Sequence, residues 1–445
     1  MNLKKIISAA AAALCLFSAV PAAVYGVGSL QAEEQLSDGT FYYELVNGSY
    51  TITSCNPEAV FEELPELRNG YAVTAIADKA FANCTYISKL TIPDTITEIG
   101  SSAFAGCTSL KEVELPSRLK VMSDGIFMGC TNLESIDIPD SVNTISSYAF
   151  YNCSKLAEVG LSGELSVIEP MAFAECSSIE SFDVGDGKSY VFEDGILYNS
   201  GKTNICRASV KLTGDVYISD GVTSIDAGAF SVCAGIENIF LPSSLSHIGD
   251  DAFGYCVSLK SIDFSEGLTT ISPVAFKNCA SLETLDFPTT LREIGDGAFY
   301  NCTKLERVII PEGTETIGEG AFVNCASLEK AAIPKSVTFV GNNAFGFELN
   351  DSGEYVLKDG FALSVFTKSA GAKYAKENKI SSSAVDKDLK SLAFLIVAVG
   401  LILAVMVFAV ALMAKSRKTA SFSAKKAKKL AKEKEEEENY KKIVD

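Results

Sequence analysis

"AFKNCASLETLDFPTTLREIGDGAF", residues 275–299, contains one complete period of a repeat that runs through most of the chain. Phe276 and Phe299 mark its two ends, 23 residues apart, and a Cys follows each Ala-Phe pair by three residues. A short fixed period predicts a solenoid, in which each repeat forms one coil and the coils stack to bury their apolar sides. The repeated Phe occupies positions 81, 104, 127, 150, 173, 230, 253, 276, 299, 322 and 345.

Each repeat contains one segment that alternates in polarity. In the repeat after Phe104, Val113 and Leu115 alternate with Glu112 and Glu114, which predicts a short strand with its carboxylates pointing away from the core. A proline, which lacks the N–H of a ladder, ends the strand. A period of 20–29 residues is typical of leucine-rich repeats. We therefore predict an α/β-type solenoid of mostly β content, a leucine-rich-repeat array of 23-residue coils, followed by a single transmembrane helix.

The regular spacing lapses once, between Phe173 and Phe230. The strand position occurs at Phe182 and next at Val216, 34 residues later, which predicts one enlarged 34-residue coil rather than an interrupted array. The insert, residues 185–215, contains short β-like runs separated by Gly and Asn-Ser-Gly turns. Two interpretations stay open for it: a binding loop, or a neutral structural insertion.

Both ends of the chain carry segments with membrane-related patterns. Residues 1–26 have a charged start, an apolar run and small residues, which indicates a signal peptide, with a retained anchor as the alternative. Residues 392–414 are uncharged and long enough to span a bilayer, and the lysines that follow indicate the cytoplasmic side. The predicted location is the cell membrane, as a single-pass protein with its N-terminal bulk outside and its C-terminus inside. The predicted order is signal peptide 1–26, strand-rich cap 27–66, solenoid 67–348, C-terminal cap 349–380, stalk 381–391, transmembrane helix 392–414 and charged tail 415–445.

The charge distribution argues against several classes of function. The net charge is −18; residues 1–26 contribute +2 and the tail from Lys415 contributes +5, so the segment between carries −18 − 2 − 5 = −25. A segment with this much negative charge repels nucleic-acid phosphates, and we expect no nucleic acid among the partners of the protein. His247 is the only histidine, too few for a histidine metal cage or a repeated proton relay. We expect no enzyme activity, no metal and no cofactor.

The repeated cysteines allow four interpretations: disulfides, a metal site, reactive thiols or packing. Equivalent residues of stacked coils lie about 4.8 Å apart with parallel side chains, whereas a disulfide needs converging Cβ atoms. No CxxC pair or nearby histidine supports a metal or a catalytic thiol. Packing is favoured, and disulfides remain the alternative because an exported protein can be oxidised. Cys55 and Cys206 lie off the repeat, and a bond between these two is not expected. The repeated cysteines are Cys84, Cys107, Cys130, Cys153, Cys176, Cys233, Cys256, Cys279, Cys302 and Cys325.

The units follow the pattern AFxxCxxL…IP…V/L…IG, and with it the chain resembles the BspA-like (Treponema-type) leucine-rich-repeat family. The motifs that carry the resemblance are "AFAGCTSLKEVELPSRL" (103–119), the opening stretch, "AFVNCASLEKAAIP" (321–334) and "EDGILYN" (193–199). The resemblance covers roughly residues 38–380 and implies a bacterial surface protein that binds other proteins or surfaces. It carries over no catalytic residue. Ile126 in place of Ala and Glu348 in place of Cys depart from the pattern.

The strands of a leucine-rich-repeat solenoid line its concave face, so the residues that flank each strand's central position are candidates for binding. The middle of this face is acidic, which predicts either simple solubility or contact with a basic protein surface or a divalent cation. The predicted function is a membrane-anchored extracellular protein for protein binding or adhesion, and a structural envelope spacer without a ligand is the alternative. The candidate residues are Glu112, Glu114, Asp137, Glu158, Asp183, Phe240, Asp263, Asp286, Arg307 and Ile309.

Overall fold

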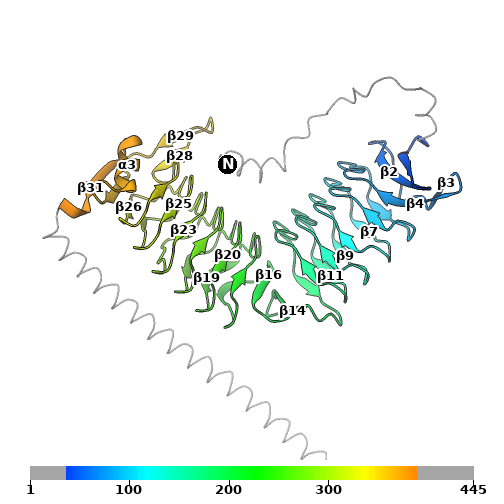
Figure 1. The fold of residues 1–445 in the computed structure, drawn as a ribbon, viewed down its shortest axis with the longest axis horizontal. Helices are drawn as coiled ribbons and strands as arrows, with labels where there is room; N and C mark the ends of the chain where they lie inside the picture. The colour runs from blue at the N-terminus through cyan, green and yellow to red at the C-terminus, as the bar shows by residue number, and fades with distance from the viewer. Residues whose placement is uncertain (1–36, 388–445) are drawn as a thin grey trace, which may run out of the picture. The chain divides into compact units, whose positions relative to one another are not determined.

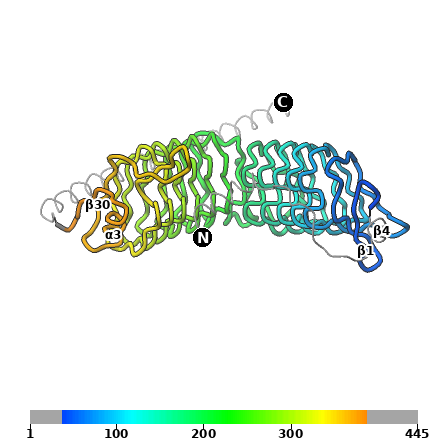
Figure 2. The backbone as a smooth tube through the Cα atoms, turned by 90° about the horizontal axis from the view of Figure 1, so that it is seen from above, coloured from blue at the N-terminus to red at the C-terminus, as the bar shows by residue number. Residues whose placement is uncertain are grey.

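A computed structural model describes residues 37–387, and this part of the chain forms a solenoid of stacked β coils. Figure 1 shows the coils following one another in chain order from β4 to β26, and Figure 2 shows the same row of coils seen from above. Each coil has three sides: two short strands and one run of tight turns that contains the repeated Phe. The predicted mostly-β solenoid of 23-residue coils is confirmed.

The first series of strands, which we call the first ladder, comes from the alternating segments. Where its strands pair, they are parallel and, between regular coils, offset by one repeat, as Lys89 pairs with Glu112 and Val308 with Ala331. Asp286 takes part through a single bridge to Asp263. The strands are β5 (Lys89–Thr91), β7 (Glu112–Glu114), β9 (Ser135–Asp137), β11 (Glu158–Gly160), β13 (Ser181–Asp183), β17 (Gly214–Tyr217), β19 (Ile236–Phe240), β21 (Ser261–Asp263), β24 (Arg307–Ile309), β26 (Lys330–Ile333) and β30 (Ala362–Val365).

Apart from the six-residue β4, the second ladder is made of two-residue strands, in which the second residue, usually Ile, points into the core. These strands also pair in parallel at an offset of one repeat, as Thr270 pairs with Glu293. They are β4 (Tyr71–Ile76), β6 (Glu98–Ile99), β8 (Val121–Met122), β10 (Thr144–Ile145), β12 (Val167–Ile168), β18 (Ser224–Ile225), β20 (His247–Ile248), β22 (Thr270–Ile271), β23 (Glu293–Ile294), β25 (Thr316–Ile317) and β27 (Phe339–Val340).

The turn side of the coils holds the stack of phenylalanine rings. Except across the insert, neighbouring rings lie nearly parallel with centroids 4.7–5.8 Å apart. The backbone of this side is bonded from coil to coil, since the N–H of Phe253 donates to the carbonyl of Ala275 and that of Phe276 to Ala298. The turn also needs a residue with positive φ, which is Asn in several coils, such as Asn278 and Asn301. The sequence therefore places apolar rings and turn-forming residues at the same fixed steps.

The repeated cysteines are buried free thiols, as packing predicts, and they also form hydrogen bonds. Eight of them donate to the carbonyl oxygen of the Phe in the preceding coil, at 2.9–3.3 Å: Cys107, Cys130, Cys153, Cys176, Cys256, Cys279, Cys302 and Cys325. The same carbonyl also accepts from the backbone N–H of the Cys in its own coil, as that of Phe104 does from Cys107, so the thiol adds a second bond that joins neighbouring coils. Cys84 has no such Phe before it, and its Sγ lies 2.7 Å from the Sγ of Cys55 instead.

Separate elements close the two ends. At the N-terminal end, β1 (Phe41–Val46) and β2 (Ser49–Cys55) form an antiparallel hairpin, β2 continues the second ladder beside β4, and β3 (Leu67–Arg68) pairs with β4.

At the C-terminal end, β28 (Phe347–Leu349) pairs with β29 (Tyr355–Leu357), and α3 (Ala370–Glu377) begins at the N-cap Ser369. β31 (Ser381–Ala384) and the short 3-10 helix Val385–Lys387 follow. Because β30 pairs with β26, the first ladder runs past Glu348, where the sequence predicted its end.

The insert forms a small antiparallel sheet that lies between the N-terminal and the C-terminal coils. It consists of β14 (Tyr190–Glu193), β15 (Ile196–Asn199) and β16 (Asn204–Ala208), which pair antiparallel, and β16 then pairs in parallel with β18. Successive residues of a strand point to opposite faces. Leu197 of β15 accordingly packs in the core cluster of the N-terminal coils, and its neighbours Ile196 and Tyr198 pack in that of the C-terminal coils.

The apolar core is therefore not continuous across the enlarged coil. No pairing joins β13 to β17 within the described residues, and Phe173 meets Phe182 edge-on instead of stacking on Phe230. The prediction that the array is not interrupted is wrong on the strand side. It holds on the turn side, where the N–H of Met171 donates to the carbonyl of Ala227 across the insert. The extra strands take the space of a regular coil and pack on both sides, so the insert has a structural role.

Within residues 37–387, no helix combines the length and the apolar composition that crossing a bilayer requires. The predicted signal peptide 1–26, the transmembrane helix 392–414 and the charged tail 415–445 lie outside the described residues.

Phe253→Ala should destabilise the fold by roughly 3–5 kcal/mol, because Phe253 is fully buried between two stacked rings and its loss leaves a cavity. Urea unfolding of the fragment 37–387, followed by circular dichroism, measures the change. Val257→Ala in the same coil is the control, since Val257 is 43% exposed and its truncation should cost far less. Equal effects of the two substitutions would show that the Phe stack does not hold the coils together.

Candidate functional site

The ten candidate residues all lie on the first ladder, at positions whose side chains point away from the core. We call the side chains at these positions the strand face. Nine of the ten are exposed, and Phe240 is half-buried. Whether this face is the concave one stays a prediction.

The spacing of the carboxylates along the strand face is uneven. Glu158 pairs with Ser135 on one side and Ser181 on the other, so small polar residues separate it from the next acid in its column. Glu112 lies 3.1 Å from the ammonium group of Lys89. The bridge between Asp263 and Asp286 brings two acidic positions together on neighbouring coils. Within residues 37–387, no three acidic, cysteine or histidine side chains lie close enough together to hold a metal ion. The divalent-cation hypothesis is therefore not supported by such a cluster.

An aromatic pair occupies the middle of the strand face. The ring of Tyr217 on β17 stacks on that of Phe240 on β19, with centroids 4.5 Å apart and planes 8° apart. Tyr217 is 55% exposed although it is large and partly apolar. Phe240 was predicted as a candidate and Tyr217 was missed. The signal was available, because Tyr217 precedes Phe240 by one repeat in the same column.

Hydrogen bonds order the residues beside the aromatic pair. The amide nitrogen of Asn238 donates to the carboxylate of Asp215 at 2.7 Å, and the hydroxyl of Ser261 donates to the amide oxygen of Asn238 at 2.6 Å. These bonds link three successive strands by side chains, and the strands themselves pair in register. Tyr217 and Phe240 thus lie on a fixed support, which lowers the entropy lost when a partner binds.

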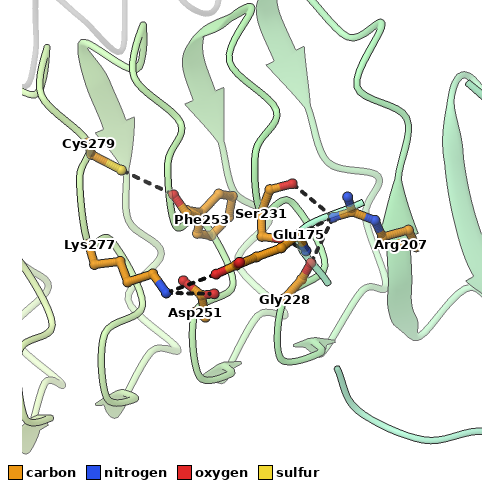
Figure 3. A network of polar contacts seen from close by, with 8 residues as sticks. All are labelled: Glu175, Arg207, Gly228, Ser231, Asp251, Phe253, Lys277 and Cys279. Atoms are coloured by element: carbon orange, nitrogen blue, oxygen red, sulfur yellow. Dashed lines mark hydrogen bonds and ion pairs between the residues drawn. The ribbon is translucent and has the colours of Figure 1, made fainter. Parts of the chain in front are cut away.

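A second group of polar residues lies buried where the insert meets the turn side (Figure 3). Arg207, from β16, is 1% exposed. Its guanidinium donates to the carbonyl oxygens of Gly228 at 2.8 Å, Ser231 at 3.0 Å and Cys176 at 3.1 Å. These carbonyls belong to the coils on both sides of the insert. Arg207 therefore joins the two halves of the array where a regular coil is missing.

Lys277 connects the same region to the next coils. Its ammonium group lies 3.2 Å from the carboxylate of Asp251 and 3.4 Å from that of Glu175, and 5.1 Å from the ring centroid of Tyr255. Asp251 is 1% exposed, and neither of its carboxylate oxygens accepts a hydrogen bond. Burial raises the pKa of Asp251 to about 7, and the positive charge of Lys277 only partly opposes this.

We regard the buried group as structural, because its charges are enclosed and paired with one another. Sequence reasoning missed it. A signal existed in Lys277, which follows the Phe of "AFKNC", where the other repeats carry an uncharged residue. Its two acidic partners could not be identified, because they come from different coils and one of them lies across the insert.

The buried Asp251 should make stability depend on pH. Its pKa is higher in the folded chain than the ordinary value of 3.8, so the folded state holds the extra proton between about pH 4 and pH 7. Stability relative to Asp251→Asn should therefore fall as the pH rises through this range, by on the order of 1–4 kcal/mol in total. Asn suits the positive φ of this position. Urea unfolding of both proteins between pH 4 and 8 measures the difference.

Val257→Ala serves as the control for that experiment, because it removes no titratable group and its difference from the unmodified protein should stay constant with pH. A constant difference for Asp251→Asn as well would contradict the raised pKa.

Comparison with solved structures places this geometry among leucine-rich-repeat proteins. A leucine-rich cell surface protein from Faecalibacterium prausnitzii is 28% identical, with a TM-score of 0.52, over 69% of this chain and 94% of that one. The pneumococcal vaccine antigen PcpA is 18% identical, with a TM-score of 0.58, over 78% of this chain and 97% of that one, a likeness of fold alone. No curated protein matches the chain.

The family comparison agrees with the repeat pattern and with the coils. The model of the BspA type leucine rich repeat region matches residues 74–203 and 223–350 in six copies. These ranges cover more than half of the chain, and the stretch left between them includes the end of the insert and the return to the regular array. The chain belongs to the BspA-type leucine-rich-repeat family.

Proposed function

We propose that this chain is a membrane-anchored extracellular protein that binds a basic protein partner, or a basic ligand of the envelope or of another cell surface, through its strand face. The observation that carries the proposal is the stack of the exposed Tyr217 on the half-buried Phe240 within an acidic surface. Membership of the leucine-rich-repeat family and the likeness to a cell surface protein support the location and the general role.

An exposed aromatic pair on an ordered support is typical of a binding hot spot. Tyrosine is enriched at such spots because it buries a large area and loses few rotamers. Nothing in the fold of the coil requires an aromatic residue at these two positions, since the equivalent positions of later coils hold Asp263, Asp286 and Ile309. The aromatic side chains are therefore available for a partner and are not needed by the core.

The surrounding charge favours a basic partner. Asp215, Asp263 and Asp286 lie on the same strands as the aromatic pair or on the coils that follow. Like charges on neighbouring coils repel, and an arginine or lysine from a partner would relieve this repulsion. Such a cation can also lie against the face of an exposed tyrosine ring. One partner residue could then use both features of the face.

The predicted anchor limits where the partner lies. The stalk predicted from the sequence, residues 381–391, reaches at most about 40 Å when fully extended, and roughly twelve stacked strand positions add about 55 Å. A partner within or just outside the envelope is easier to reach than a distant surface.

Replacing four acids of the strand face by Asn (Asp137, Asp183, Asp263 and Asp286) should weaken binding at least about tenfold, because the attraction to a basic partner is lost. Tyr217→Ala should weaken it to a similar extent through lost aromatic contact. The measurement is pull-down and flow cytometry with the tagged fragment 37–387 on envelope extracts and intact cells, at low and high salt. High salt should reduce the binding of the unmodified fragment.

The matched control changes four exposed acids outside the strand face to Asn: Asp140, Asp220, Asp351 and Asp359. It alters the net charge equally and should keep binding intact. Unchanged binding after the four strand-face replacements would refute the basic partner. Failure of the unmodified fragment to bind any extract or cell would favour a structural spacer.

A further inference from the structure

We propose that Cys55 and Cys84 form a disulfide bond that fastens the N-terminal cap to the first coil, and that the cysteines of the regular coils remain thiols. The two Sγ atoms lie 2.7 Å apart, within about 0.7 Å of the bonded distance of about 2.05 Å. Both side chains are buried, at 7% and 4% exposure. The sequence placed Cys55 off the repeat and gave it no partner.

The position of Cys84 in the array explains why it differs from the other repeated cysteines. In a regular coil the thiol donates to the carbonyl of the preceding coil's Phe, as Cys107 does to Phe81 at 3.1 Å. Cys84 belongs to the first coil with the repeated Phe, and the cap before it has a hairpin instead of a coil. Its thiol therefore meets Cys55, at the end of β2, in place of a backbone oxygen.

The backbone holds the two residues in this position. The N–H of Cys55 donates to the carbonyl of Ala80 at 3.2 Å, and Phe41 and Phe61 of the cap contact the ring of Phe81. The thiols thus approach each other because β2 is already fixed against the first coil, so little rearrangement is needed to bond them.

The bond has a physical benefit at this end of the solenoid. A terminal unit packs against a neighbour on one side only, so it is the first part of a stack to open. A cross-link between residues 29 positions apart limits the unfolded states of the cap. In the coils, by contrast, each thiol already has a carbonyl partner and neighbours on both sides.

The reaction is a two-electron oxidation. Both S–H bonds break, one S–S bond forms, and two protons and two electrons pass to the disulfide of an exported thiol oxidoreductase, whose S–S bond breaks to give a dithiol. Export, predicted from residues 1–26, is what would bring the chain to such an oxidant.

Peptide mapping of the full-length protein, purified from membranes, unfolded in denaturant and alkylated with iodoacetamide before any reduction, tests the bond. Trypsin releases Cys84 in the peptide 80–89 and Cys55 in a peptide that ends at Arg68. We expect these two peptides to be linked and to separate on reduction, with alkyl groups on the cysteines of the coils. Alkylation of both Cys55 and Cys84 before reduction would overturn the proposal, as would linked peptides from neighbouring coils.

Thermal unfolding and hydrogen exchange provide a second measurement. Cys55→Ser and Cys84→Ser should each speed exchange in β1 and β2 and lower the melting temperature by several degrees, and reductant should have the same effect on the unmodified protein. Cys206→Ser, in the half-buried off-repeat cysteine, is the control and should leave the reductant effect intact. No effect of reductant on cap exchange would refute the cross-link even if both serine variants failed to fold.

Discussion

The structure depends on the contact between one phenylalanine ring and the same ring of the next coil. Each ring fills the interior of its own coil and also forms the surface on which the next coil packs. The centroids of neighbouring rings are 4.7–5.8 Å apart, close to the 4.7–4.9 Å between hydrogen-bonded strands. Because the two distances nearly agree, the rings can stack while the backbone bonds of neighbouring coils form. The short cysteine side chain fits beside the ring, and its thiol donates a second hydrogen bond to a Phe carbonyl that already accepts one within its own turn.

The insert shows what happens when this contact is lost. Phe173 and Phe230 do not stack, and the two cores are separated by β15, which is apolar on both faces. On the turn side, Arg207 donates from a single side chain to carbonyls of the coils on both sides of the insert. A long cationic group is suited to this because its N–H groups fan out in one plane. Its burial is tolerable because several carbonyls and the nearby carboxylates surround it.

The repeat spacing was enough to predict the coil, the strand and the outward positions, because each depends on residues of one unit and its identical neighbour. Features that join unlike parts of the chain were not predictable. Arg207 lies in a polar stretch, "NICRAS", that gives no sign of burial. Asp251 and Glu175 become neighbours of Lys277 only because the turn side continues across the insert. Tyr217 was missed for a different reason: the insert hid that it shares a column with Phe240.

The position of the aromatic pair follows from the insert as well. In a regular array a residue of the strand face has a neighbour of the same column on each side, one strand spacing away. β17 is paired with β19 on one side and has no pairing with β13 on the other. Phe240 covers the ring of Tyr217 on the β19 side. Tyr217 is the first aromatic residue of its column, and the ladder is interrupted on its other side. A large exposed aromatic residue at such a point has more accessible area than the same residue inside a continuous ladder. The insert thus acts on the strand face mainly by ending one series of strands where the aromatic pair begins the next.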